Sequence, residues 1–439
     1  MAPRWDRRPR AAVVATLIEL TRQQRSLHRT TAQVRAEQLV GLREALSVAR
    51  RSSFWREQLA SVPDPLPLSE LRDLEAIPIV DKAVVRAIPE ADRFTSVPPA
   101  NSRKVHTSGT TGIPLDVWYG PRAAWWQGVL QLRAALQRGQ RLWDRTAAVD
   151  LGIGDARQLP PVWNALKRRA RLELGLDDDL EALAELVIAR HPAAMSGHPH
   201  LLIELGEALR GRYRPATLVS RGVTLTIENR RILRELYGTE PVDVYGSSEC
   251  GVIAWQCRAR DLYHVNHEAV VVEIVDDRGA AVTPGTIGRV VITNLWNQLM
   301  PFVRYSIGDS AAWAPRQCRC GSPLPALTDL SGRTFTWMVG ADGERLAPQR
   351  FWSPLHLPAD VVRDIKRYRV RQRADRSVVI DVVAGELLDA ENEERWRSTY
   401  QRILGPVPVE IRRVESIDIR REEKFEVVSS EATAATDGS

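Results

Sequence analysis

The sequence predicts an α/β fold, in which a large N-terminal domain with mixed sheets and flanking helices precedes a small α+β C-terminal domain. The length of 439 residues exceeds the usual size of one domain, and 44% apolar residues suffice for packed cores. Helical patterns alternate with short apolar runs between residues 176 and 237. After Arg333 the pattern changes to short strands and helices, which is typical of a separate small domain.

The chain is expected to begin with amphipathic helices. Between residues 10 and 60, apolar side chains recur at helical spacing among many arginines and glutamines, which predicts two helices. We expect four parts in total: an N-terminal helical extension at 1–34, a large domain at 35–332, a small domain at 333–428 and a disordered tail at 429–439.

Three further helices are predicted between residues 176 and 237. The pattern LDDDLEALAELVIARH has Asp177 as its expected N-cap, PHLLIELGEALRG ends at Gly211, and ENRRILRELYG ends at Gly238. Short apolar strands separate these helices.

The segment 269–294 predicts a different arrangement. Its two β-branched runs are joined through Asp-Arg-Gly and Pro-Gly turns, which indicates antiparallel strands. In the C-terminal part we expect strands at 366–372 and 377–383 and a helix at 391–404.

Charge and composition argue against several classes of partner. The formal net charge is +6, but both signs are spread over the chain, so a nucleic-acid partner is not expected. No apolar run approaches the ~20 residues that span a bilayer. Four cysteines are too few for a secreted disulfide scaffold, and the N-terminal sequence lacks a convincing cleavage site, which favours a cytoplasmic protein.

The strongest local signal is a run of small and hydroxyl residues from Thr107 to Gly112, namely Thr107, Ser108, Gly109, Thr110, Thr111 and Gly112. Glycines allow close approach of the backbone, and successive N–H groups and hydroxyls form a concave set of donors for an oxyanion such as phosphate. The spacing is not that of a Walker loop, and the run contains no lysine. An ordinary surface loop is the alternative.

A second cluster follows the apolar run that ends at Val244. Tyr245 can stack on a base, and Glu249 can hold Mg²⁺, beyond a turn made of Gly246, Ser247 and Ser248. The alternative is a strand and a turn with a solvated glutamate.

A third segment places Asp309 directly after a glycine. A carboxylate in this position can accept hydrogen bonds from two ribose hydroxyls, whereas an aspartate in a surface turn is the alternative.

The cysteines suggest a metal site. Cys257, His264, Cys318 and Cys320 together provide three thiolates and one imidazole, which form a common closed zinc set. His267 is a competing imidazole, and Cys250 is not expected to be a ligand. Four unrelated buried or free thiols are the alternative, because the spacing is not that of a standard zinc finger.

From Leu42 to Val428 the sequence resembles the adenylate-forming superfamily (acyl- and aryl-CoA ligases, luciferase and adenylation domains), and within it the phenylacetate-coenzyme A ligase-like branch. The resemblance rests on nine segments in order: FWREQL with IPIVDKAVVRAIPE, HTSGTTGIP, MSGHPHLLIEL, VDVYGSSECG, VVVEIVDDRGAAVTPGTIGRVVITN, MPFVRYSIGD, CRCGSPLPAL, SGRTFTWMV and RREEKFEVV.

The resemblance implies an ATP- and acid-binding domain at 35–332 and a mobile C-terminal lid at 333–428. Ser108 to Gly112 would grip pyrophosphate, with Thr110 counted among the catalytic residues. Tyr245 would lie on adenine, and Glu249 would bind Mg²⁺ and take part in catalysis. The remaining roles fall to Asp309 and Arg333, which would bind the ribose, and to Lys424, which would be the catalytic lysine. Some members of the branch carry a zinc site, which would be structural here.

The implied reaction converts Mg·ATP and an organic acid into an acyl adenylate and pyrophosphate, after which a nucleophile displaces AMP. Coenzyme A is the family default for that nucleophile. Transfer to an amine or carrier protein, or activation of an unusual oxyanion such as nitrite in a biosynthetic pathway, is the alternative. A monomer or a homodimer is expected.

Some positions depart from the family pattern. Ile113 stands where many relatives carry lysine, Val223 replaces an acidic residue, and Thr334 and Phe335 occupy the hinge. These departures favour a second alternative, a non-catalytic nucleotide-binding interaction protein. The tryptophans after the phosphate loop suggest a pocket for an aromatic or flat apolar acid, and they are Trp125, Trp126, Trp143 and Trp163.

Overall fold

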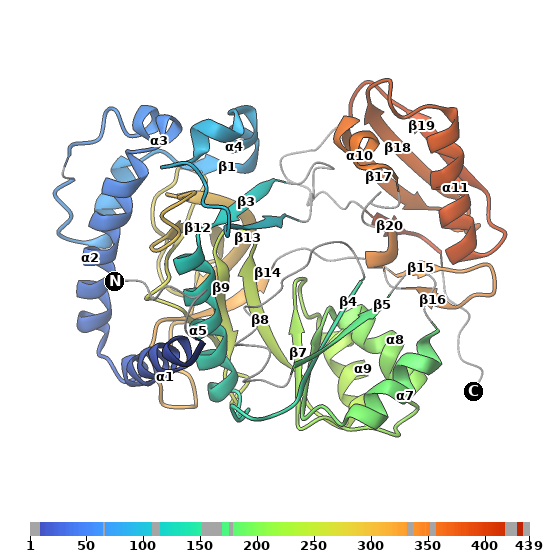
Figure 1. The fold of residues 1–439 in the computed structure, drawn as a ribbon, viewed down its shortest axis with the longest axis horizontal. Helices are drawn as coiled ribbons and strands as arrows, with labels where there is room; N and C mark the ends of the chain where they lie inside the picture. Colours follow the sequence, from blue (N-terminus) through green and yellow to red (C-terminus); the bar gives the residue numbers. More distant parts are fainter. Residues whose placement is uncertain are drawn as a thin grey trace.

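The structure is a computed structural model, and it describes residues 9–64, 66–107, 115–151, 169–174, 179–331, 337–346, 348–351, 357–417 and 428–432. The chain forms a large domain around a 12-stranded mixed sheet and a smaller C-terminal domain around a four-stranded sheet (Figure 1). This architecture confirms the predicted fold class.

Half of the large sheet is parallel. Its strands lie in the order β8-β7-β6-β4-β5, and every neighbouring pair in this series is parallel. The strands are β4 (Thr146–Leu151), β5 (Arg169–Leu174), β6 (Ala194–Gly197), β7 (Thr217–Arg221) and β8 (Val242–Ser247). Since the carboxyl ends of parallel strands meet at one edge, this half provides a natural position for a ligand site.

Three helices pack together beside the parallel strands (Figure 1). They are α7 (Leu180–Arg190), α8 (Pro199–Leu209) and α9 (Ile227–Tyr237). Two of the expected ends are confirmed: Gly211 lies just past the left-handed C-cap of α8, and Gly238 is the left-handed C-cap of α9. The predicted N-cap of α7 is wrong, because Asp179 caps the N–H groups of Glu181 and Ala182, whereas Asp177 lies outside the described residues.

The sheet continues from β8 in the order β9-β10-β14-β13-β12-β11, with every neighbouring pair antiparallel, and the short β1 pairs parallel with β13. The strands β11 and β12 pair antiparallel from Val270↔Asn294 to Val275↔Arg289, as predicted for the segment 269–294. The bounds are β9 (Gly251–Gln256), β10 (Tyr263–Val265), β11 (Val270–Val275), β12 (Gly288–Asn294), β13 (Tyr305–Trp313) and β14 (Ala326–Ser331).

Three helices, rather than the two predicted, form the start of the chain. Thr30 begins the second helix with a capping box, and Ser52 caps the third, so the pattern is interrupted twice. The elements are α1 (Pro9–Ser26), α2 (Thr31–Ala49), α3 (Ser53–Gln58), η1 (Leu71–Ala76), β1 (Val80–Asp81), α4 (Lys82–Ala87), η2 (Glu90–Arg93), β2 (Arg103–His106), β3 (Asp116–Tyr119) and α5 (Pro121–Gln137).

The helix α1 packs along α5 (Figure 1). Trp125 donates its indole N–H to Thr16 Oγ1 at 3.0 Å, and the buried Arg133 donates to Gln23 and Ser26. The expected N-terminal extension is therefore attached to the large domain by specific contacts.

The C-terminal sheet has the order β19-β18-β17-β20 and a core that includes Trp396 and Tyr400 of α11. The predicted strands and helix are found, and β20 places Ser429 and Ser430 in the sheet, two residues past the expected end of this domain. The elements are β15 (Met338–Val339), β16 (Arg345–Leu346), η3 (Pro348–Phe351), α10 (Ala359–Asp364), β17 (Ile365–Gln372), β18 (Val378–Ala384), α11 (Ala390–Leu404), β19 (Val409–Arg413) and β20 (Val428–Ser430).

A buried ion pair joins the C-terminal domain to α8. Arg350 Nη2 lies 2.8 Å from Glu204 Oε2, and the two side chains are 6% and 4% exposed. Trp337 meets His200 of the same helix edge to face, with 4.7 Å between ring centres. Among the described residues, no helix is long and apolar enough to cross a membrane.

Candidate functional site

The predicted phosphate loop is carried by a β-hairpin. The strands β2 and β3 pair antiparallel up to His106↔Asp116, and Thr107 closes the pair beyond that point. Thr107 donates its backbone N–H to the Leu115 carbonyl at 3.0 Å, and its Oγ1 accepts from the Leu115 N–H at 2.7 Å. Thr107 therefore holds the two ends of the loop together.

Charged side chains reinforce this stem. Asp116 lies 2.6 Å from His106 Nδ1 and also pairs with Lys104. Burial raises the pKa of Asp116, but hydrogen bonds and charge from His106 and Lys104 outweigh this effect and lower it. The carboxylate is therefore ionised at neutral pH.

The hairpin is attached to the turn that follows β8. Ser248 Oγ donates to the His106 carbonyl at 3.2 Å, and Tyr119 donates its hydroxyl to the Ser248 carbonyl. Two segments more than a hundred residues apart in the sequence are thus brought together.

The turn requires glycine at its start. A Cβ on Gly246 would lie 2.4 Å from the Gly251 carbonyl oxygen, and Gly251 itself has φ +72°. Ser247 Oγ accepts from the Cys250 N–H at 3.2 Å and fixes the turn that carries Glu249.

Replacement of Gly246 by alanine is expected to move the Ser247–Glu249 turn, because neither the new Cβ nor the Gly251 carbonyl oxygen can rotate away from the other. We expect a loss of about 1–3 kcal/mol in the free energy of unfolding, measured by urea denaturation. Gly211→Ala is the control. A Cβ at Gly211 would have no atom within 4 Å, so this variant measures only the cost of placing alanine at a φ of +71°. An unchanged free energy of unfolding in Gly246→Ala would show that the contact with Gly251 does not constrain the turn.

Tyr245 and Asp309 are in direct contact. Tyr245 donates its hydroxyl to Asp309 Oδ2 at 3.0 Å, and the residue is 8% exposed in the main core cluster. Burial and the charge of Asp309 raise the pKa of the Tyr245 phenol well above its usual value, so it stays a donor. The residues predicted to bind adenine and ribose are therefore direct neighbours.

Glu249, at the end of the Ser247–Glu249 turn, is buried, with 6% of its surface exposed. Its Oε1 accepts from the Tyr305 hydroxyl at 3.0 Å, and its carbonyl accepts from Asn294 Nδ2 at 2.9 Å. Burial and the nearby Glu249 raise the pKa of Cys250, so this cysteine is a neutral thiol, and it belongs to the main core cluster. A carboxylate oxygen is a ligand type that Mg²⁺ prefers.

Several predicted site residues lie outside the described part of the chain. These are Ser108, Gly109, Thr110, Thr111, Gly112, Ile113, Trp163, Arg333, Thr334, Phe335 and Lys424. Their assignments remain predictions from the sequence.

Three of the four tryptophans that were expected to line an acyl pocket lie among the described residues, and these three have other surroundings. Trp125 and Trp126 pack with Leu20 of α1, and Trp143 is 66% exposed. The expected aromatic pocket therefore has no support from these three side chains. Val223, at 9% exposure, lies in the connection after β7.

A row of polar residues across the ends of the parallel strands was not predicted from the sequence. Register pairs align Val149 with Gly197, and Gly197 with Ser220. The next positions are therefore Asp150 and Arg221, with His198 between them, and Arg221 is paired with Val244, the residue before Tyr245.

Within this row, Arg221 Nη2 donates to Asp150 Oδ1 at 2.6 Å, across the intervening strand β6. The signal in the sequence was a charged residue at the end of each of two apolar runs. Only the strand order makes the two residues neighbours.

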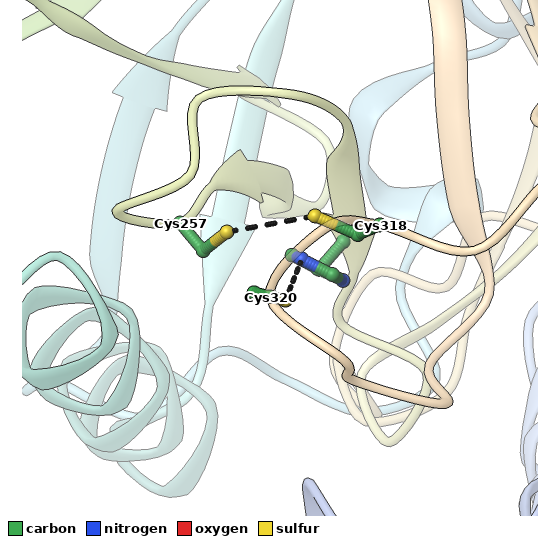
Figure 2. A group of neighbouring side chains, drawn as sticks. Cys257, Cys318 and Cys320 are labelled. Atoms are coloured by element: carbon green, nitrogen blue, oxygen red, sulfur yellow. Dashed lines mark hydrogen bonds between the residues drawn. The ribbon is translucent and has the colours of Figure 1, made fainter.

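The four predicted metal ligands converge. The ligand atoms of Cys257, His264, Cys318 and Cys320 all lie within 4.8 Å of one another. Figure 2 shows the side chains of the three cysteines close together. The Cys257 and Cys318 sulfurs are 3.7 Å apart, and Cys320 Sγ is 3.4 Å from His264 Nε2. In a tetrahedral zinc site, the ~2.3 Å and ~2.0–2.1 Å bonds to sulfur and nitrogen place such atoms about 3.8 Å and 3.6 Å apart.

The chemistry of the cluster also fits a metal. Burial lowers the pKa of His264 to about 4, so its imidazole is neutral and able to ligate at pH 7. Burial raises the pKa of Cys257 to about 12. A hydrogen bond from the Ala259 backbone opposes this increase, and the charges of Cys318 and Cys320 add to it. A bound cation would remove this cost of holding three thiolates together.

His267, the competing imidazole, is not part of the cluster. It is fully buried beside Glu268, with 3.3 Å between His267 Nε2 and Glu268 Oε1. Asp261 links the two segments that carry the four predicted ligands. It lies between Cys257 and His264, and it accepts hydrogen bonds from the Arg316 guanidinium at 2.6 and 2.8 Å and from the Arg319 backbone N–H at 3.2 Å.

Comparison with known proteins adds a sequence relative and a set of structural relatives. No family model matches the chain. A phenylacetate-coenzyme A ligase of Thermus thermophilus is 26% identical over 320 residues, which cover 66% of this chain and 68% of that protein.

The structural comparison covers nearly the whole chain. A 2-hydroxyisobutyryl-CoA ligase in complex with 2-HIB-AMP and CoA has a TM-score of 0.66 at 20% identity, with 92% of this chain and 91% of that chain covered. The same ligase in its postadenylation state has a TM-score of 0.62 at 20% identity, with the same coverage. These similarities show a common fold.

Proposed function

Since the chain belongs to the adenylate-forming ligase superfamily, we propose that it activates an organic acid with ATP and transfers the acyl group to coenzyme A. The first step forms an acyl adenylate and releases pyrophosphate. The second step forms a thioester and releases AMP.

The observation that carries this proposal is the meeting of three sequence segments at one place. Thr107 closes the stem of the predicted phosphate loop, and Ser248 donates a hydrogen bond to that stem. Tyr245, at the end of the strand before Ser248, donates a hydrogen bond to Asp309. These long-range polar contacts support a nucleotide site, and turnover is what distinguishes a ligase from the non-catalytic nucleotide-binding alternative.

The roles that the resemblance implies agree with the chemistry of these residues. Ser108 to Gly112 would bind the leaving pyrophosphate through N–H groups and hydroxyls, and Thr110 would act at the phosphates. Asp309 and Arg333 would bind the ribose, beside Tyr245 at the adenine. Glu249 would hold Mg²⁺, which when bound neutralises phosphate charge.

Lys424 would stabilise the charge that develops when the carboxylate oxygen attacks the α-phosphate. Two anions must meet in this step, so a cation is needed at the reacting atoms. We propose that the C-terminal domain at 333–428 acts as a lid that brings Lys424 to this position and then moves to admit the second substrate.

The proposal is tested by measuring AMP release from Mg·ATP with a panel of aryl, aliphatic and amino acids plus nitrite, each with and without coenzyme A. A thioester should form with at least one acid. AMP release without thioester would indicate an amine or a carrier protein as acceptor. ATP binding without turnover across the panel would favour the non-catalytic alternative.

We further propose that the cluster of Cys257, His264, Cys318 and Cys320 holds a structural zinc ion. Four protein ligands leave no open position for catalysis, so the ion would join the turn after β9 to the loop before β14.

The purified protein is expected to contain about one zinc ion per chain, and Cys318→Ser to contain almost none. Loss of the link should cost about 2 kcal/mol, which corresponds to a melting temperature lower by roughly 4–8 °C. Zinc content is measured by elemental analysis, with Cys250→Ser as the control that should keep its zinc. Full zinc content in Cys318→Ser would contradict this assignment.

A further inference from the structure

The four proposed zinc ligands come from two segments of the chain. The segment after β9 carries Cys257 and His264, and the loop before β14 carries Cys318 and Cys320. A backbone N–H bonds back to the Cys257 carbonyl in the first segment, and another bonds back to the Cys318 carbonyl in the second, both at 3.0 Å. These turns shape each segment by itself, and a further contact is needed to hold one segment against the other.

Asp261 provides this contact from the first segment. Its two oxygens accept from Nη1 and Nη2 of Arg316 at 2.6 and 2.8 Å, which is a bidentate pair, and Oδ2 also accepts from the Arg319 backbone N–H at 3.2 Å. Bidentate bonds between two charged groups fix geometry as well as adding energy. Because Arg319 lies between Cys318 and Cys320, the bond to its backbone holds the chain that carries both cysteines.

The surroundings of Asp261 keep it in one place. Its side chain is 8% exposed, whereas Arg316 is 56% exposed, so the carboxylate is covered although its partner reaches solvent. The next residue, Leu262, is 2% exposed and packs with Cys257 and Cys318. A covered carboxylate is stable only when it is paired, so this side chain is committed to its arginine and N–H partners.

This arrangement has a direct consequence for metal binding. A closed tetrahedral site takes ligands from both segments, so zinc binds with four ligands only when the segments are together. A contact that holds them in place beforehand reduces the ordering cost of binding. Groups just outside the ligands of a metal site typically change metal affinity by about 10–100-fold.

We infer that Asp261 is a positioning residue that assembles the metal site before zinc binds. The inference rests on the zinc ion proposed above. Asp261 acts through Arg316 and through the backbone of Arg319, and it is not itself a ligand. The ligand spacing in the sequence gives no sign of this role, because the partners of Asp261 lie on the other segment.

The test measures the dissociation constant of zinc for the full chain by competition with a chromophoric chelator. Asp261→Asn keeps the size of the side chain but removes its charge and one acceptor oxygen, so it should weaken zinc binding about tenfold or more. Arg316→Met leaves the Arg319 N–H bond in place and should weaken binding by a smaller factor, about threefold or more. Arg316→Lys keeps the charge and should recover part of this loss.

Glu410→Gln is the matched control. It breaks a bidentate pair with Arg412, at 2.7 and 2.8 Å, in the C-terminal domain, and it should leave the zinc affinity unchanged. Cobalt(II) bound in place of zinc reports the ligand geometry by its visible absorption. Asp261→Asn should keep the tetrahedral spectrum of the wild type at saturating cobalt, because all four ligands remain.

Wild-type zinc affinity in Asp261→Asn would overturn the inference while leaving the zinc assignment intact, and so would an equal loss in Glu410→Gln. If Asp261→Asn does not fold, the exposed Arg316 decides the question, and wild-type affinity in Arg316→Met would overturn the inference. Absence of zinc binding in the wild type would instead overturn the zinc assignment, and the inference with it. Acid activation is measured separately and is not decided by these outcomes.

Discussion

Lys424→Ala is expected to reduce acid-dependent pyrophosphate exchange by about 100-fold or more, because it removes the one cation that is proposed to stabilise the charge formed in the attack on the α-phosphate. ATP binding should change little, since the ribose, the adenine and the leaving pyrophosphate are assigned to residues of the large domain. The measurement is kcat for exchange at saturating ATP and acid, together with the dissociation constant of ATP.

Lys366→Ala provides the matched control, because it removes another of the few lysines of the C-terminal domain. This variant should keep wild-type exchange. Unchanged exchange in Lys424→Ala, or an equal loss in both variants, would contradict the role given to Lys424.

Arg133→Met should lower the free energy of unfolding by about 3–5 kcal/mol, because it leaves a buried carboxylate without its cation. Arg133 is fully buried, lies 2.6 Å from Glu268 Oε1 and stacks on the Trp255 ring with its guanidinium carbon 5.2 Å from the ring centre. It also bonds Gln23 and Ser26, so the loss should loosen α1.

Urea denaturation measures this effect, and the double variant Arg133→Met with Glu268→Gln should recover part of the loss because no charge remains buried alone. Arg231→Met, at a half-exposed ion pair, should cost less than about 1 kcal/mol. A loss below about 1 kcal/mol in Arg133→Met would show that the buried network does not stabilise the domain.

The same network predicts a pH dependence. Burial raises the pKa of Glu268, but the charges of Arg133 and His267 outweigh this and hold it at about 2. Because the folded value is below the unfolded value of ~4.3, the stabilisation is present above pH ~4.3 and is lost as the pH falls towards 2.

Local pattern was enough to predict the segments that depend on local chemistry. The turns between 269 and 294 predicted the pairing of β11 with β12, and Gly238 predicted the end of α9, because turn and cap residues act on their own neighbours. The convergence of Cys257, His264, Cys318 and Cys320 was also predicted, because three thiolates and one imidazole form a common zinc set.

Features set by distant parts of the chain could not be predicted in this way. Arg133 reads as a solvated charge on an amphipathic helix until α1 is placed over it. The contact between Asp150 and Arg221 depends on β6 lying between β4 and β7, and no local signal gives that strand order. Trp125 likewise points to α1 because of a tertiary contact with Thr16.

The central claim, activation of an acid through an acyl adenylate, is tested most directly by following the carboxylate oxygen. A substrate acid labelled with ¹⁸O in its carboxylate is incubated with Mg·ATP, coenzyme A and the enzyme, and the AMP is analysed by mass spectrometry. If the carboxylate oxygen attacks the α-phosphate, the AMP should carry one ¹⁸O atom for each thioester formed. Unlabelled AMP, or ADP in place of AMP, would contradict the proposed reaction.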